Sequence, residues 1–117
     1  MLRIPLRVGG LVIVNDVFLI TREEQLAALA LRHKLPTIFQ SRDSVVAGGL
    51  MSYGGSASDA YRQAGVYIGR VLKGEKPANL PVQQSTKIEL IINLKPAKTL
   101  GITIPLPLSG RADELIE

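Results

Sequence analysis

The hydrophobic residues follow two alternating patterns along the chain. Short, continuous apolar runs rich in β-branched residues are typical of buried strands in a parallel sheet, and they occur at residues 11–14, 36–39, 45–52 and 88–92. Between them, apolar residues three or four positions apart are typical of amphipathic helices, which we expect over residues 21–33, 56–72 and 94–100. Strands that alternate with helices predict an α/β fold with a mainly parallel sheet flanked by helices.

Polar residues mark the expected beginnings of these helices. Thr21 and Glu24 have the spacing of a capping box, in which Thr21 is the N-cap. Ser56 and Asp59 repeat this arrangement at the second helix, and Asn93 is the expected N-cap of the third. The second helix carries one apolar face, formed by Ala60, Ala64, Tyr67, Ile68 and Val71.

The remaining segments are expected to be less regular. Residues 53–55 contain two glycines and predict a loop before the second helix. Residues 102–107 are bounded by proline and predict an extended segment, whereas residues 111–117 are expected to end the chain in one or two helical turns.

The composition narrows the possible chemistry. The chain has 117 residues, enough for one domain, and 46% of them are hydrophobic. It has no cysteine and one histidine, which excludes thiolate catalysis and zinc–cysteine sites, so we expect no metal and no other cofactor. The net charge of +4 comes from scattered basic residues without the basic stripe of a nucleic-acid-binding protein. No pattern demands catalysis, so we expect a binding protein and not an enzyme.

Polar side chains follow the first strands of the predicted sheet. In open α/β sheets, ligands bind at the carboxyl ends of the strands, where loops are expected at residues 15–18, 40–43 and 52–56. Arg42 could instead form a local ion pair with Asp43. The candidate ligand-binding residues in these loops are Asp16, Ser41, Arg42, Ser52, Tyr53, Gly54 and Ser56.

The chemistry of these side chains suits an amino-acid-like zwitterion. Asp16 can accept a hydrogen bond from a ligand amine, whereas Ser52, Ser56 and the free N–H groups of the second helix can hold a carboxylate. Tyr53 can stack on a ligand ring or form a hydrogen bond with it. In the alternative interpretation, Asp16 is a turn residue and Tyr53 anchors a loop.

Several stretches of sequence together resemble a known family. The most specific is Gly-Gly-Leu-Met-Ser-Tyr-Gly at residues 48–54, followed by Asp59 and Tyr61. Further matching stretches lie at residues 10–16, 25–30, 33–38, 61–69, 72–81, 89–95 and 111–117. In combination they are similar to ABC-transporter substrate-binding proteins, the family that includes tryptophan- and tyrosine-type binding proteins.

This resemblance implies one lobe of a type I periplasmic-binding-protein-like, flavodoxin-like fold. It covers residues 10–117, whereas residues 1–9 depart from the family pattern, as does Val17, where the family usually has proline. Complete members have a signal peptide and two lobes that close around a small solute, and they work with an ABC permease. The first lobe and the signal peptide are missing here, through truncation, a misannotated start or natural fragmentation. The resemblance thus implies the C-terminal lobe of a periplasmic protein, which would be cytoplasmic if expressed as written.

Two alternatives to a solute-binding lobe stay open. The chain could be a stand-alone cytoplasmic regulatory or interaction domain, or it could be a non-functional fragment. A lobe without its partner lobe exposes apolar surface, and such patches favour association. A homodimer is therefore expected if the chain folds alone.

Overall fold

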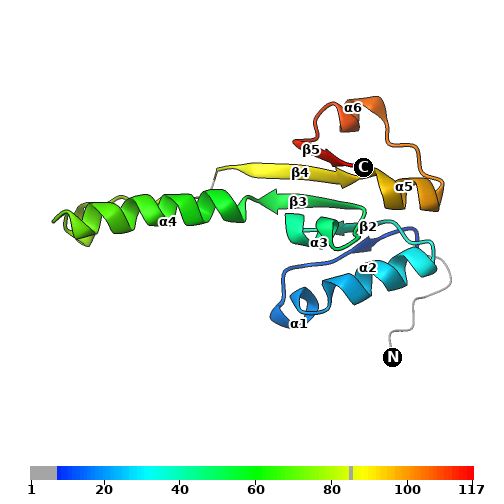
Figure 1. Cartoon of the computed structure of the whole chain (residues 1–117), viewed down its shortest axis with the longest axis horizontal. Coiled ribbons are helices and arrows are strands. Elements are labelled where there is room, and N and C mark those ends of the chain that lie inside the picture. Colours follow the sequence, from blue (N-terminus) through cyan, green and yellow to red (C-terminus); the bar gives the residue numbers. More distant parts are fainter. Residues whose placement is uncertain (1–7, 85) are drawn as a thin grey trace.

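The computed structural model describes residues 8–84 and 86–117, which form a five-stranded sheet, helices that pack on it, and a long helical arm (Figure 1). The strands are β1 (Leu11–Val12), β2 (Thr37–Phe39), β3 (Met51–Gly55), β4 (Ile88–Asn93) and β5 (Glu114–Ile116). They lie in sequence order across the sheet: β1, β2 and β3 are parallel, β4 is antiparallel to β3, and β5 is parallel to β4. The predicted α/β fold with a mainly parallel sheet is confirmed.

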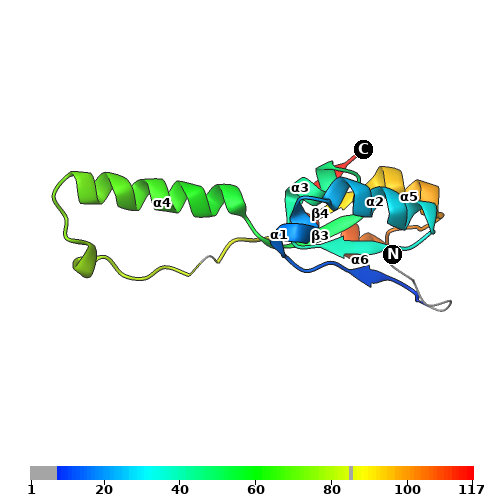
Figure 2. The same cartoon turned by 90° about the horizontal axis from the view of Figure 1, so that it is seen from below.

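In the described part of the chain, six α-helices and one 3₁₀ turn connect these strands. They are α1 (Val17–Ile20), α2 (Glu23–Arg32), α3 (Arg42–Val46), α4 (Ala57–Leu72), η1 (Pro77–Asn79), α5 (Leu94–Leu100) and α6 (Leu106–Ser109). Figure 2 shows α2, α3 and α5 together on one side of the sheet, and we call the side that they cover the inner face. The core cluster on the inner face consists of Ile13, Ala27 and Phe39, with Leu19 and Leu26 packed against it.

The second half of strand β4 is deeply buried in the sheet. Ile91 pairs with Ser52 and lies on the inner face, whereas Ile92 pairs with Met51 and Leu115 and lies on the opposite, outer face. Both isoleucine side chains are buried. By contrast, Val12 and Tyr53 on the outer face of β1 and β3 are exposed. The outer face is therefore covered near β4 and open near the other edge of the sheet.

The chain leaves the sheet after β3 and returns to it at β4. Between these strands, α4 projects away from the sheet, and η1 and the following segment lead back alongside it (Figures 1 and 2). The radius of gyration is 17.7 Å, whereas a compact chain of this length has about 13 Å. The arm accounts for this extended shape.

Two of the expected helix beginnings are confirmed, and one is wrong. The Ser56 hydroxyl accepts from the backbone N–H of Asp59 at the start of α4, and Asn93 caps α5 in the same way. Thr21 does not cap α2, because a short helix that the sequence analysis missed, α1, ends at this residue. The Thr21 hydroxyl donates to the carbonyl of Phe18 instead.

The strand expected over residues 45–52 is displaced along the chain. Residues 42–46 form α3, and the strand begins only at Met51, so residues 53–55 are part of β3 and not a loop. Gly48 has a φ of 119°, and a Cβ on Gly49 would lie 2.6 Å from the ring of Phe39. These two glycines therefore form a tight turn that delays the strand.

The end of the chain also differs from expectation. The segment predicted to be extended over residues 102–107 is cut short, because α6 begins at Leu106, and residues 114–116 form β5 and not helical turns. The backbone N–H of Leu90 donates to the carboxylate of Asp113 at 2.7 Å, and the Asp113 N–H donates to the Leu90 carbonyl at 2.8 Å. These bonds lead the last residues into register beside β4, where a strand gains ladder hydrogen bonds.

Candidate functional site

The carboxyl ends of β1, β2 and β3 meet at one edge of the sheet, because the three strands are parallel neighbours. The chain continues from these ends into α1, α3 and α4, which all begin at this edge (Figure 1). The backbone N–H of Asn15 donates to Oε1 of Gln40 at 3.2 Å and joins the first two loops. We call the surface formed by residues 15–16, 40–41 and 55–56 the carboxyl edge.

Asp16 begins α1 at the carboxyl edge. Its Oδ1 accepts from the backbone N–H groups of Phe18 at 2.9 Å and Leu19 at 3.4 Å, so the carboxylate is an N-cap. Val17 occupies the first helical position, where proline is also well tolerated. The absence of the family's usual proline is thus compatible with a helix beginning at this residue.

Ser41 takes part in a hydrogen-bonded chain of three side chains. Its Oγ accepts from the backbone N–H of Ser44 at 3.4 Å and lies 2.9 Å from Oγ of Ser44. The Ser44 hydroxyl donates to the carboxylate of Glu23, so the Ser41 hydroxyl is the donor to Ser44. The proton of Ser41 is therefore used within the protein, and only acceptor capacity is left for a ligand.

Glu23 is the polar residue at this edge that the sequence analysis missed. It is partly buried and lines a small cavity of about 10 Å³ together with Asn15, Gln40, Ser44 and apolar neighbours. The spacing of a capping box from Thr21 pointed to Glu24, the acid next to Glu23. A second acid in the first turn of an amphipathic helix, directly before its apolar stripe, was the available signal.

Arg42 does not form the predicted ion pair with Asp43 but binds Glu114 across the sheet. Its Nε donates to Oε2 of Glu114 at 2.7 Å, and its Nη2 donates to Oε1 at 2.8 Å. This bidentate geometry ties the start of α3 to β5. The hydrogen bond from Arg42 lowers the pKa of the Glu114 carboxyl, and the same bond raises the pKa of Arg42. An ion pair with Asp43 would have joined neighbouring residues of α3 only, whereas the pair with Glu114 links α3 to β5.

Replacing Glu114 by glutamine is expected to lower the melting temperature slightly at pH 7, because the pair is exposed. The folded-state pKa of Glu114 lies below its unfolded value, so the pair stabilises the chain fully above about pH 4.3. Its contribution is lost as pH falls through the lowered pKa. Thermal melts of both proteins from pH 7 to about pH 3 should therefore converge in acid. A pH-independent gap between the curves would contradict this account.

The other four candidate residues lie along β3 and at its end. Ser52 is buried on the inner face between Phe39 and Ile91, and its ligand role stays a prediction. Tyr53 is exposed on the outer face of the sheet. Gly54 backs onto the carbonyl of Gln40, which a Cβ at this position would overlap. Ser56 is the buried N-cap of α4. Asp16, Ser41 and Ser56 thus come together at the carboxyl edge as helix caps.

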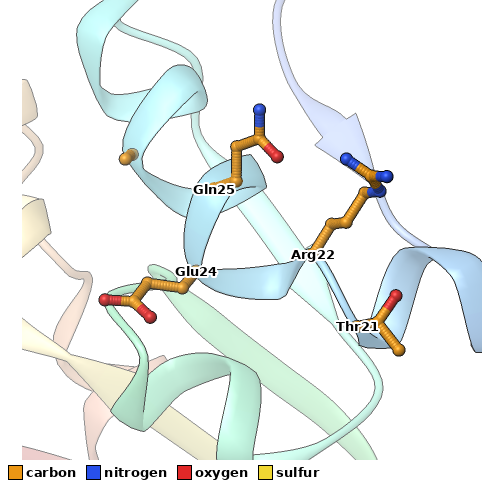
Figure 3. Close-up of a pocket in the computed structure, with 5 residues that line it drawn as sticks. Thr21, Arg22, Glu24 and Gln25 are labelled. Carbon is orange, nitrogen blue, oxygen red and sulfur yellow. The ribbon is translucent and has the colours of Figure 1, made fainter.

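An open hollow lies elsewhere, on the solvent-facing side of α2 (Figure 3). It is an open depression of about 520 Å³ lined by Thr21, Arg22, Glu24, Gln25 and Ala28. The guanidinium of Arg22 lies 4.5 Å from the centre of the Phe18 ring, and Figure 3 shows Glu24 pointing to the other side of the helix. Because its polar groups do not converge, this hollow lacks the character of a ligand site.

Two further features bear on function. In residues 8–84 and 86–117, no cluster of three or more acidic, histidine or cysteine side chains is placed to hold a metal ion. Within the same residues, each helix is too short or too polar to cross a bilayer.

Sequence comparison identifies a family. The family model described as "ABC transporter substrate binding protein" matches residues 1–116. It is the family that the sequence resembles, and the match includes residues 1–9. Among curated proteins, none matches the chain.

Solved structures resemble nearly the whole chain. A conserved domain protein from Vibrio cholerae O1 biovar El Tor is 27% identical with a TM-score of 0.81, covering 92% of this chain and 36% of that protein. An ABC domain from Streptococcus pneumoniae, solved in complex with L-Trp, is 30% identical with a TM-score of 0.82, covering 94% and 37%. A substrate-binding protein with adhesive properties from Clostridium difficile, ligand-free and open, shares the fold at 21% identity and a TM-score of 0.63, covering 90% and 35%. The chain thus spans about a third of the length of the solved proteins that it resembles.

Proposed function

The chain belongs to the ABC transporter substrate-binding protein family, and we propose on that basis that it forms one wall of a solute-binding cleft. The observation that carries this proposal is the convergence of the carboxyl ends of β1, β2 and β3, where open α/β sheets bind ligands. Polar groups gather at this edge in Asp16, Glu23 and Gln40. The other wall would come from a second lobe, which accords with the greater length of the solved relatives.

The proposed ligand is an amino-acid-like zwitterion. The relative from Streptococcus pneumoniae was solved with L-Trp, which supports this ligand class. Asp16 would bind the ligand amine through Oδ2, because Oδ1 caps α1. The first N–H groups of α4 beside Ser56 would favour the carboxylate, since helix N-termini attract anions. The exposed ring of Tyr53 is available for stacking, although it lies on the outer face.

The remaining elements of the proposal follow from the family. The protein would act by binding and not by catalysis, and it would work in the periplasm with an ABC permease. Alone, the chain would associate into a homodimer, because apolar side chains on α4 and on the outer face of the sheet are exposed.

A chimera would test the ligand assignment. The 117-residue chain would replace the matching 37% of the Streptococcus pneumoniae protein, which supplies a complete second lobe. Isothermal titration with L-Trp, other aromatic amino acids and branched amino acids is expected to show saturable binding of at least one. A folded chimera that binds no amino acid would overturn the amino-acid assignment.

Replacing Asp16 by asparagine in this chimera is expected to weaken amino-acid binding by about 10- to 100-fold, because a charged hydrogen bond to the ligand amine is lost. Asparagine caps helices as well as aspartate does, so the melting temperature should hardly change. The matched variant Asp16→Ala should lose both affinity and stability. Equal affinities for the original chimera and Asp16→Asn would remove Asp16 from the proposed site.

A further inference from the structure

The hydrogen bonds among Glu23, Ser44 and Ser41 join α2 to α3. Glu23 is the first residue of α2, whereas Ser41 is the N-cap of α3 and Ser44 lies in its first turn. The two helices pack against each other on the inner face of the sheet (Figure 2). Because Glu23 and Ser44 are 21 residues apart in sequence, the fold is needed to bring them together. We call these three residues the Glu23 network.

The carboxylate of Glu23 fixes the direction of the hydrogen bonds in the network. A carboxylate accepts only, so the hydroxyl of Ser44 donates to Glu23. Ser44 has a single hydroxyl proton, and Ser41 must therefore be the donor across the 2.9 Å between the two Oγ atoms. Without Glu23, either serine could be that donor. Since Ser44 is buried, Glu23 keeps the hydroxyl proton of Ser41 directed into the protein.

Ser41 retains one acceptor position that the network does not use. A hydroxyl oxygen has two lone pairs, and one of them accepts from the backbone N–H of Ser44 at 3.4 Å. The second lone pair remains, on a partly buried residue of the carboxyl edge. An ammonium group carries only donors, whereas a carboxylate carries only acceptors. The oxygen of Ser41 therefore suits a ligand ammonium group and offers no donor to a ligand carboxylate.

Glu23 itself is set back from the position of a ligand. The cavity beside it measures about 10 Å³, which is room for about one water molecule. Apolar side chains, including those of Ile13, Leu19 and Phe39, line this cavity. A ligand group larger than water would reach Glu23 only if these side chains moved. Ser41 is thus the member of the network that is placed to touch a ligand, and Glu23 acts through it.

We propose that Glu23 is a positioning residue that makes Ser41 an acceptor for the ammonium group of the ligand. Glu23 thereby sets specificity, because a ligand without an amine gains nothing from Ser41. Asp16 and Ser41 supply two acceptors for the three donors of the ammonium group, and the Asn15–Gln40 hydrogen bond joins the loops that carry them. This inference rests on the proposed function and adds a specificity-determining residue to the same cleft.

Two probes that differ only in the amine would test the inference in the chimera: L-Trp, and indole-3-propanoate, which lacks the ammonium group. Ser44→Ala breaks the network and leaves the charge of Glu23 in place. Isothermal titration is expected to show about 3- to 10-fold weaker binding of L-Trp, since a hydrogen bond to a charged group loses its orientation. Binding of indole-3-propanoate should change by less than about 2-fold, whereas structural damage would weaken both probes alike.

A second variant addresses the carboxylate. Glu23→Gln leaves a side chain that can donate as well as accept, so the direction of the bonds is no longer fixed. Binding of L-Trp is expected to weaken by about 3- to 10-fold. The matched control is Glu24→Gln, which removes the same charge from the adjacent, exposed residue and should have an effect below about 2-fold. Combining Glu23→Gln with Ser44→Ala should weaken binding no further than Ser44→Ala alone, because Glu23 acts through Ser44.

Each outcome decides the inference. If the chimera binds L-Trp and Ser44→Ala affects both probes equally, the positioning role is wrong and the proposed function stands. If the chimera binds L-Leu in place of L-Trp, the probes are L-Leu and 4-methylpentanoate, with the same expected difference. A chimera that binds no amino acid rejects the proposed function and this inference with it.

The direction of the network can also be measured without a ligand or a second lobe. In NMR spectra of the 117-residue chain, the hydroxyl proton of Ser44 is expected to lie against the side chain of Glu23. This measurement decides if the chimera does not fold. A Ser44 proton directed at Ser41 would make Ser41 a donor and would overturn the inference.

Discussion

Replacing Gly54 by alanine is expected to lower the free energy of unfolding by about 3 kcal/mol or more, a large share of the stability of a small domain. The new Cβ would overlap the carbonyl oxygen of Gln40 and lie 3.1 Å from its carbonyl carbon. Both obstacles are backbone atoms at the end of β2, so they cannot move aside as a flexible side chain would. Because Gln40 also joins two loops of the carboxyl edge, the damage would extend to the candidate site.

Urea unfolding followed by circular dichroism would measure this effect. The matched control is Gly65→Ala in α4, where a Cβ meets nothing within 4 Å. That substitution should stabilise the chain by about 0.5–1 kcal/mol, because alanine favours a helix over glycine. If Gly54→Ala were as stable as the original chain, the close approach of β3 to Gln40 would be refuted.

Replacing Ile92 by alanine is expected to cost about 2–5 kcal/mol, because the side chain is 0% exposed and its removal leaves a cavity. Ile88 offers a matched control, since it lies on the same face of the same strand but is 48% exposed. Ile88→Ala should cost less than about 1.5 kcal/mol. Equal losses in urea unfolding would show that burial does not decide the stability of β4.

Features of the fold that depend on local sequence were predictable. The cap at Ser56 and the cap at Asn93 were both recognised, because an N-cap hydroxyl or amide acts on backbone groups two or three residues away. The apolar runs that became β2 and β4 were also recognised, since buried strands need continuous hydrophobic side chains.

Features that depend on distant partners were not predictable. Residues 114–116 became a strand because β4 offered a free edge. The local sequence of residues 111–117 contains no information about that edge. Thr21 and Glu24 satisfied the spacing of a capping box, yet Asp16 capped an earlier helix that ends at Thr21. At Thr21, the predicted cap was therefore displaced by a competing cap at Asp16. At residues 114–116, the predicted helical turns were displaced by pairing with β4.

The candidate site was predictable in position more than in detail. The parallel sheet predicted that the loops after β1 and β2 lie together, and the Asn15–Gln40 hydrogen bond joins them. The partner of Arg42 was not predictable, because Glu114 is 72 residues away in sequence. The role of Glu23 was hidden for the same reason, since its partner Ser44 belongs to α3.

The excursion between β3 and β4 has a consequence for the order of folding. These strands form the most extensive pairing of the sheet, over five residue pairs, and 32 residues separate Gly55 from Ile88. Pairings that are distant in sequence form slowly, because the loop between them must close first. During synthesis, β1, β2 and β3 leave the ribosome before β4, the partner of β3 on its other edge, has been made. The free edge of β3 is then open to other chains, so the nascent protein is most prone to aggregate while its arm is being made.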